Sequence, residues 1–126
     1  MANLEQTVLI VDDMSDYRIT LGALLRQNFP NARILKADGT ESAVILLEKE
    51  SDKDGIRLII DGLEGEWKDM VNRALSFGIP KDNMIVFSAT VDIQKEVEAK
   101  GIKFQLKPES PQLESTVVSM GNSLRL

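Results

Sequence analysis

The chain has 126 residues, of which 43% are hydrophobic and 28% are charged, and its formal net charge is −5. This composition suits one domain with a buried core, and the acidic balance argues against nucleic-acid binding, which usually needs a basic face. Cysteine and histidine are absent, which excludes disulfides, thiolate chemistry and histidine-based catalytic or metal sites. No apolar run reaches membrane-spanning length and residues 1–6 lack a signal-peptide pattern, so we expect a single cytoplasmic domain over 1–126.

Short apolar runs alternate along the chain with longer amphipathic segments. Apolar residues at helical spacing indicate the helices, and short continuous apolar runs indicate the strands. In chain order, the pattern predicts a strand over 7–11, a helix over 16–27, a strand over 32–37, a helix over 41–49, a strand over 57–60, a helix over 66–77, a strand over 84–87, a helix over 91–100, a strand over 103–106 and a helix over 111–120.

The helix ends and the strand composition refine this outline. Thr40 is the expected N-cap of the second helix, Gly78 stands where a left-handed C-cap would end the third, and Gly101 closes the fourth. The first, third and fourth strands are continuous apolar runs, typical of parallel strands that are buried on both faces by helices. The second strand is less apolar, so we expect it near an edge. The whole pattern therefore predicts an α/β protein with a parallel sheet.

Polar residues follow several of the predicted strands. Asp12 and Asp13 end the first strand, Asp61 the third, Ser88 the fourth and Lys107 the fifth. Because the carboxyl ends of parallel strands meet at one edge of a sheet, and ligands bind there, we expect these side chains to converge on one cleft.

Three carboxylates in one cleft repel one another unless some are protonated or a cation holds them together. All-oxygen ligation without histidine or cysteine suits a hard ion, above all Mg²⁺. A metal ion and a lysine can neutralise phosphoryl oxygens while a hydroxyl donates a hydrogen bond, and a carboxylate can itself be the nucleophile. The predicted cleft is therefore suited to phosphoryl transfer onto an aspartate.

Four motifs carry a resemblance to a known family. They are VLIVDD at 8–13, LIID at 58–61, VFSA at 86–89 and FQLKP at 104–108. Together, in this order and at these strand ends, they resemble the receiver domains of bacterial response regulators in two-component signalling. The resemblance covers nearly the whole chain and implies a flavodoxin-like (βα)5 fold, a doubly wound five-stranded parallel sheet with the order 2-1-3-4-5.

The resemblance also implies roles for particular residues. Asp61 would be the phosphoacceptor, and Ser88 and Phe104 would form the switch that relays phosphorylation to a distant surface. The residues implied to bind ligands are Asp12, Asp13, Asp61 and the Leu63 backbone carbonyl for Mg²⁺, and Ser88, the Ala89 backbone amide and Lys107 for the phosphoryl group.

The implied partners are those of a phosphorelay. The donor would be a phosphohistidine on a sensor histidine kinase or a histidine phosphotransfer protein, and the output would go to a downstream protein target or a fused output domain. We expect no nucleic acid to bind through this domain and no membrane association. The chain would take part in its own phosphotransfer without being an enzyme.

The sequence departs from the family pattern on two segments. The run 62–67, GLEGEW, lacks the Met-Pro pair that usually follows the phosphoacceptor, and the stretches from Asp61 to Ser88 and from Ser88 to Lys107 are each about three residues short. We therefore expect a trimmed loop after the third strand and a short fourth helix, with a monomer or a dimer through the first and fifth helices. Leu63 cannot orient an attacking water and Thr90 could do so only modestly, which predicts slow self-dephosphorylation.

Other functions stay open. The trimmed segments favour a degenerate receiver that acts as a protein-interaction module without phosphate. A small phosphatase with an aspartyl nucleophile would place a second acid where Met14 stands, and a flavin-binding relative would have glycines and hydroxyls in 12–16.

Each candidate residue also has a purely structural explanation. Asp12 and Asp13 could cap the first helix, and Asp61 before a glycine could form only a turn. Ser88 and Lys107 could be ordinary strand ends. Phe104 could be a packing residue that also fits the switch position.

Overall fold

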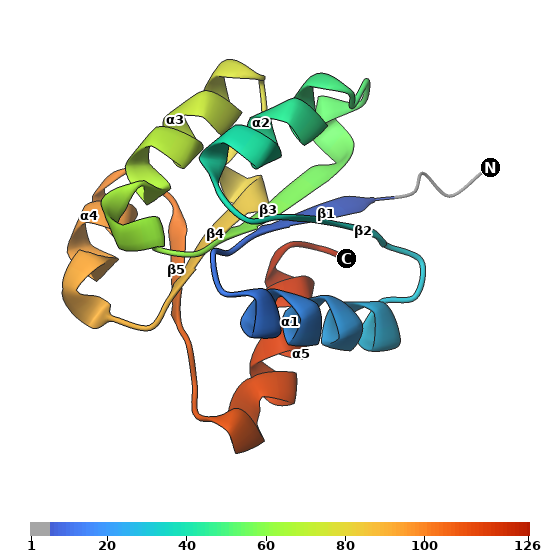
Figure 1. The fold of residues 1–126 in the computed structure, drawn as a ribbon, viewed down its shortest axis with the longest axis vertical. Coiled ribbons are helices and arrows are strands. Elements are labelled where there is room, and N and C mark those ends of the chain that lie inside the picture. Colours follow the sequence, from blue (N-terminus) through green and yellow to red (C-terminus); the bar gives the residue numbers. More distant parts are fainter. Residues whose placement is uncertain (1–5) are drawn as a thin grey trace.

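A computed structural model describes residues 6–126 of the chain as an α/β fold with one parallel sheet. The strands lie in the order β2-β1-β3-β4-β5, and every neighbouring pair is parallel. This confirms the expected doubly wound fold (Figure 1). The bounds of the strands and helices are β1 Thr7–Val11, α1 Ser15–Asn28, β2 Arg33–Ala37, α2 Thr40–Glu48, β3 Ile56–Ile60, α3 Trp67–Ser76, β4 Met84–Ser88, α4 Gln94–Ala99, β5 Lys103–Leu106 and α5 Leu113–Ser123.

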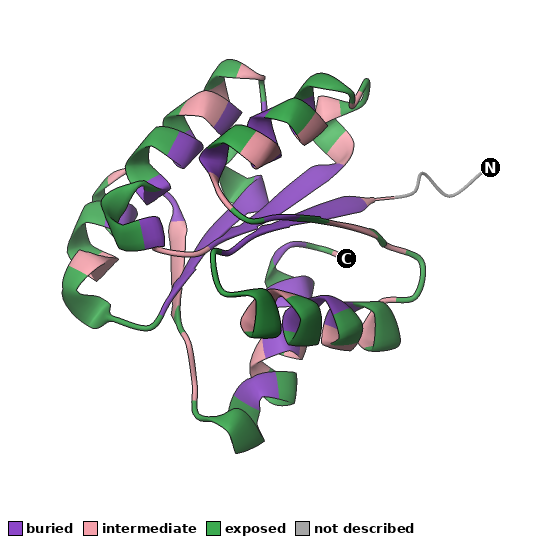
Figure 2. Cartoon of the chain, in the orientation of Figure 1, coloured by how far each residue is buried: buried purple, intermediate pink, exposed green. Residues whose placement is uncertain are grey.

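Burial separates the central strands from the edges. All residues of β1, β3 and β4 are buried, as the purple strands in Figure 2 show, whereas β2 and β5 at the two edges are partly exposed. The continuous apolar runs therefore mark the centre of the sheet, and the edge position expected for β2 is confirmed.

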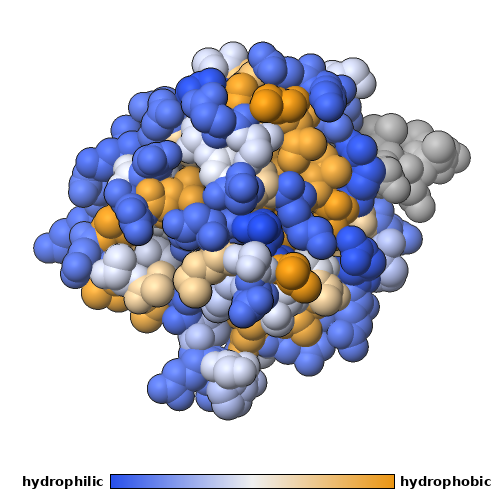
Figure 3. Space-filling view, viewed as in Figure 1, coloured by the Kyte–Doolittle hydropathy of each residue, from blue (hydrophilic) through white to orange (hydrophobic). Residues whose placement is uncertain are grey.

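Two hydrophobic cores lie on opposite faces of the sheet. Alternate residues of β1 point to each: Leu9 and Val11 join the core beneath α2, α3 and α4, whereas Val8 and Ile10 join the core beneath α1 and α5. The rim of the face seen in Figure 3 is mainly hydrophilic. None of the helices between residues 6 and 126 is long and apolar enough to span a bilayer.

The helix ends agree with the sequence in part. Gly78 and Gly101 have positive φ values of 90° and 79°, which confirms both as left-handed helix ends. The prediction that Thr40 caps α2 is wrong: Gly39 occupies the cap position, and the Thr40 hydroxyl is buried without a hydrogen-bond partner within residues 6–126. The hydroxyl of Ser42 instead accepts a hydrogen bond from the Asp38 amide and donates one to the Asp38 carboxylate.

The fourth helix is short, as expected, and it begins later than the predicted range 91–100. A 3₁₀ turn at Val91–Ile93 precedes an α4 of six residues, and the Thr90 hydroxyl accepts a hydrogen bond from the Asp92 amide at the start of that turn. The last helix likewise begins with a 3₁₀ turn, Ser110–Gln112, which contains Pro111. The two turns follow β4 and β5 in the chain.

Candidate functional site

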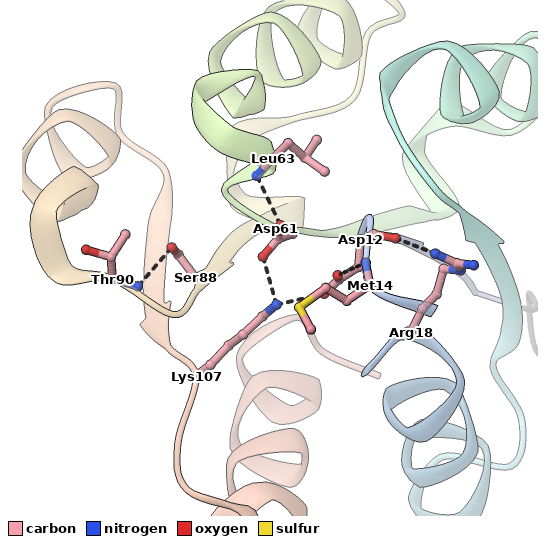
Figure 4. A network of polar contacts seen from close by, with 8 residues as sticks. All are labelled: Asp12, Met14, Arg18, Asp61, Leu63, Ser88, Thr90 and Lys107. Atoms are coloured by element: carbon pink, nitrogen blue, oxygen red, sulfur yellow. Dashed lines mark hydrogen bonds and ion pairs between the residues drawn. The ribbon is translucent and has the colours of Figure 1, made fainter. Parts of the chain in front are cut away.

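The carboxyl ends of β1 and β3 bring two acids together. The Asp61 amide donates a hydrogen bond to the Val11 carbonyl over 2.8 Å, and the Asp12 amide donates to the Ala37 carbonyl over 3.1 Å. Each strand pairing thus continues one residue past the strand end. The backbone itself therefore fixes Asp12 and Asp61 side by side at the edge where Figure 4 draws them.

Three carboxylates lie close enough to share one cation. Asp12, Asp13 and Asp61 each offer an oxygen, and these atoms all lie within 4.8 Å of one another. Asp12 is buried, Asp61 is half-buried and Asp13 is exposed. Partial loss of solvent around its carboxylate, together with the negative charges of Asp61 and Asp12, raises the pKa of Asp13. The cluster therefore carries the repulsion that a bound cation would relieve.

Lys107 reaches this cluster from the end of β5. Its amide donates a hydrogen bond to the Ser88 carbonyl over 2.7 Å, which places the side chain at the sheet edge. Its ammonium donates to Asp12 Oδ2 over 2.8 Å and to Asp61 Oδ1 over 2.7 Å (Figure 4). The Lys107 side chain is 7% exposed. Burial alone would lower the pKa of Lys107, but its bonds to the two carboxylates outweigh burial and raise it.

The second oxygen of Asp61 faces the following loop. Asp61 Oδ2 accepts a hydrogen bond from the Leu63 amide over 3.0 Å. Leu63 and Glu64 both have left-handed backbones, with φ values of 52° and 53°, which costs free energy for residues with a Cβ. The Leu63 carbonyl, expected as a Mg²⁺ ligand, accepts a hydrogen bond from the Glu66 amide over 3.0 Å. Its predicted role as a ligand stays a prediction.

Ser88 and Ala89 lie at the opposite wall of the site. The Ser88 hydroxyl is buried and accepts a hydrogen bond from the Thr90 amide over 3.2 Å. Gly62 leaves room for it, since a Cβ at Gly62 would lie 3.1 Å from Ser88 Oγ. A cleft of about 380 Å³ opens here, lined by residues that include Asp13, Asp61, Gly62, Leu63, Ser88, Ala89 and Lys107.

Two expected residues lie outside the lining of this cleft. Asp12 is buried and does not line the cleft, but it is bonded to Lys107, which does. Phe104 is half-buried in β5 and packs against the core beneath α3 and α4. The structure thus brings together the acids, the lysine and the hydroxyl, while the switch role of Phe104 stays a prediction.

Sequence reasoning missed residues at and just after the start of α1 that contact the site. Arg18 donates a hydrogen bond to the Asp12 carbonyl over 2.6 Å, and the Met14 amide donates to Asp12 Oδ1 over 2.9 Å. The Tyr17 ring lies 4.2 Å from the Lys107 ammonium. The available signal was position: Met14 follows the acid pair directly, and Tyr17 and Arg18 follow within the first turns of α1, so they had to lie at the same sheet edge.

Comparisons with known proteins agree on the fold. No protein-family model matches the chain, and no curated protein matches it. A response regulator from Thermotoga maritima superposes with a TM-score of 0.73 at 21% identity, covering 98% of this chain and 100% of that one. A response regulator receiver domain protein from Clostridium thermocellum gives 0.72 at 17%, covering 95% and 94%.

A third solved structure is the receiver domain from the hybrid histidine kinase CckA. It superposes with a TM-score of 0.67 at 21% identity, covering 94% of this chain and 98% of that one. The similarity therefore extends over nearly the full length of this chain and of all three solved structures. The chain has the fold of response-regulator receiver domains.

Proposed function

We propose that this chain is a phosphoacceptor switch of two-component signalling, in which Asp61 accepts a phosphoryl group from a phosphohistidine. One observation carries the proposal: the Lys107 ammonium bridges Asp12 and Asp61 at the wall of an open cleft. A buried lysine held by two acids is ready to neutralise the added charge as soon as one of them becomes an acyl phosphate.

The three carboxylates fit a Mg²⁺ ion. Asp12, Asp13 and Asp61 supply the hard oxygen ligands that Mg²⁺ prefers, and the exposed side of Asp13 leaves room for the waters that this ion keeps. When bound, the ion would neutralise phosphoryl oxygens. The Leu63 carbonyl is proposed as a further ligand. Its oxygen accepts a hydrogen bond from the Glu66 amide with one lone pair, so it would have to bind the ion with the other.

The transfer itself would be an attack by a carboxylate. An oxygen of Asp61 forms a bond to phosphorus, the bond from phosphorus to the donor imidazole breaks, and its electron pair leaves with that imidazole, which takes up a proton. Lys107, the Ser88 hydroxyl and the Ala89 amide would hold the phosphoryl oxygens. Since Asp61 Oδ1 already accepts from Lys107, the ammonium can pass from the carboxylate to the phosphoryl group with little movement.

The Ser88 hydroxyl would start the switch. It now accepts a hydrogen bond from the Thr90 amide, and turning toward a phosphoryl oxygen would release that amide and the short 3₁₀ turn behind it. Phe104, which packs beneath α4, would follow. A sensor histidine kinase or a histidine phosphotransfer protein would be the donor, and a downstream protein or fused output domain would read the change. The setting is cytoplasmic, and nucleic acid and membrane are not partners of this domain.

Beryllofluoride binding tests the proposal. Trp67 is the only tryptophan in the sequence, is fully buried, and begins α3, the helix that follows the loop after Asp61, so its fluorescence can follow changes in that segment. We expect a fluorescence change that needs both beryllofluoride and Mg²⁺, that is lost in Asp61→Asn, and that is kept in Asp69→Asn on the exposed side of α3. A wild-type protein that does not respond, with NMR spectra also unchanged, would contradict the proposal.

A second function is favoured by the loop after Asp61. Leu63 and Glu64 hold strained left-handed backbones, and the Leu63 carbonyl is already bonded. A loop whose carbonyl is not free to bind a metal ion would suit a degenerate receiver that binds a protein partner without phosphate. The same beryllofluoride titration separates the two functions, because the degenerate module would bind neither Mg²⁺ nor beryllofluoride.

A further inference from the structure

The Lys107 ammonium lies against two aromatic rings. Nζ is 4.2 Å from the centre of the Tyr17 ring and 5.9 Å from that of Phe87. The two rings meet edge to face, with centres 5.9 Å apart and planes at 61°. Tyr17 comes from the first turns of α1 and Phe87 from β4, so two separate elements support the lysine, and neither residue lines the cleft.

The ring completes the surroundings of the ammonium. A lysine has three N–H donors, and two of them go to Asp12 and Asp61. The face of an aromatic ring is negative and attracts a cation within about 6 Å, most strongly where water is excluded. At 4.2 Å and with a side chain only 7% exposed, Lys107 meets both conditions. The Tyr17 ring therefore shields one side of the ammonium from solvent.

We propose that Tyr17 is a positioning residue for phosphoryl transfer, whose ring holds the Lys107 ammonium beside Asp61. The inference rests on the proposed function, because it concerns the rate at which Asp61 is phosphorylated. Without the ring, the ammonium has a further side open to water and a wider range of positions. It then spends less time where it can neutralise an incoming phosphoryl group.

The aromatic ring, rather than the hydroxyl, is the active part. The Tyr17 hydroxyl is buried and has no hydrogen-bond partner among residues 6–126. Tyr17→Phe keeps the ring and removes only that hydroxyl, so it is the conservative variant. Tyr17→Leu keeps an apolar side chain against the core beneath α1 but removes the negative ring face.

The test compares the rates at which the variants are phosphorylated in the presence of Mg²⁺ and acetyl phosphate. The mass of the intact protein, measured over time, gives each rate. We expect Tyr17→Phe to keep the wild-type rate within about twofold and Tyr17→Leu to slow it roughly tenfold. In a Lys107→Met background, adding Tyr17→Leu should have no further effect, because the ring acts only through the ammonium. A loss in Tyr17→Leu that is equal in both backgrounds, or no loss at all, would overturn the inference.

The NMR signals of the Lys107 ε-methylene group provide a second readout. An aromatic ring in this position changes the chemical shifts of these protons. We therefore expect the changed chemical shifts in the wild type and in Tyr17→Phe, and ordinary ones in Tyr17→Leu. The outcomes are distinguishable: a wild type that accepts no phosphoryl group fails the proposed function and this inference with it. A wild type that is phosphorylated, with Tyr17→Leu equally fast or with no ring-dependent shift, fails this inference alone.

Discussion

Lys107 and Asp61 directly follow strands that are not neighbours, β5 and β3, yet their side chains are bonded over 2.7 Å. β4 lies between β3 and β5, so the lysine reaches across the end of a whole strand. It can do so because the Lys107 amide is fixed on the Ser88 carbonyl at the end of β4. The bond therefore ties three strand ends together, and the contact that would serve chemistry also stabilises the sheet edge.

Removing the lysine should destabilise the protein in a way that Mg²⁺ repairs. Lys107→Met leaves Asp12 and Asp61 facing each other without a cation, and we expect a loss of about 3 kcal/mol in the free energy of unfolding by urea. Added Mg²⁺ should restore part of that lost free energy. It should stabilise Lys107→Met by more than it stabilises the wild type. Lys68→Met is the control, because the pair of Lys68 with Glu96 is half-exposed and should cost about 0.5 kcal/mol at most. An equal loss in both variants would contradict the buried bridge.

Relieving backbone strain after Asp61 should stabilise the protein. Glu64 is exposed and has a φ of 53°, so Glu64→Gly removes the penalty of a Cβ in the left-handed region and should gain about 1 kcal/mol. Glu66 nearby has an ordinary φ of −75°, and Glu66→Gly should lose stability instead. Chemical denaturation of both variants checks the opposite signs. A loss of stability in both variants would mean that the backbone of Glu64 is not left-handed in solution.

Two helical glycines should respond in opposite directions to alanine. A Cβ at Gly121 in α5 would overlap the ring of Phe29, so Gly121→Ala should cost about 2 kcal/mol. A Cβ at Gly22 in α1 would meet its neighbours at 3.5 Å or more, so Gly22→Ala should gain about 0.5 kcal/mol from helix propensity. Thermal unfolding measures both. Adding Phe29→Leu to Gly121→Ala should cost less than the sum of the two single changes, and simple additivity would argue against that contact.

The phosphorylated protein should lose its phosphoryl group slowly. Leu63 is buried and apolar and Thr90 is exposed at the cleft, so neither holds a water well for attack on phosphorus. We expect the adduct to last for minutes to hours after the donor is removed. Thr90→Gln, which adds an amide that can orient water, should shorten that lifetime several-fold. A wild-type half-life of seconds would contradict the prediction.

The fold could be predicted because its signals are local. The apolar runs that became β1, β3 and β4 are buried on both faces, and a polar residue directly after each run had to lie at the shared carboxyl edge. The convergence of Asp12, Asp61 and Lys107 followed from that topology alone.

What could not be predicted depends on local hydrogen bonds, backbone conformations and helix packing that residue types do not specify. Thr40 is a good capping residue by type, but the Ser42 hydroxyl pairs with Asp38 and the cap position falls on Gly39. Nothing in the run 62–67 identifies Leu63 as left-handed, because its type disfavours that conformation. The place of Tyr17 beside Lys107 needed the angle at which α1 crosses the sheet, which periodicity does not give.

The mass of the protein after incubation with Mg²⁺ and acetyl phosphate tests the central claim most directly. The control variants are Asp61→Asn, which removes the proposed acceptor, and Asp16→Asn, which changes an exposed acid of α1. We predict one phosphoryl adduct on the wild type and on Asp16→Asn, and none on Asp61→Asn or without Mg²⁺. An adduct that survives Asp61→Asn, or a wild type that takes none, would contradict the account.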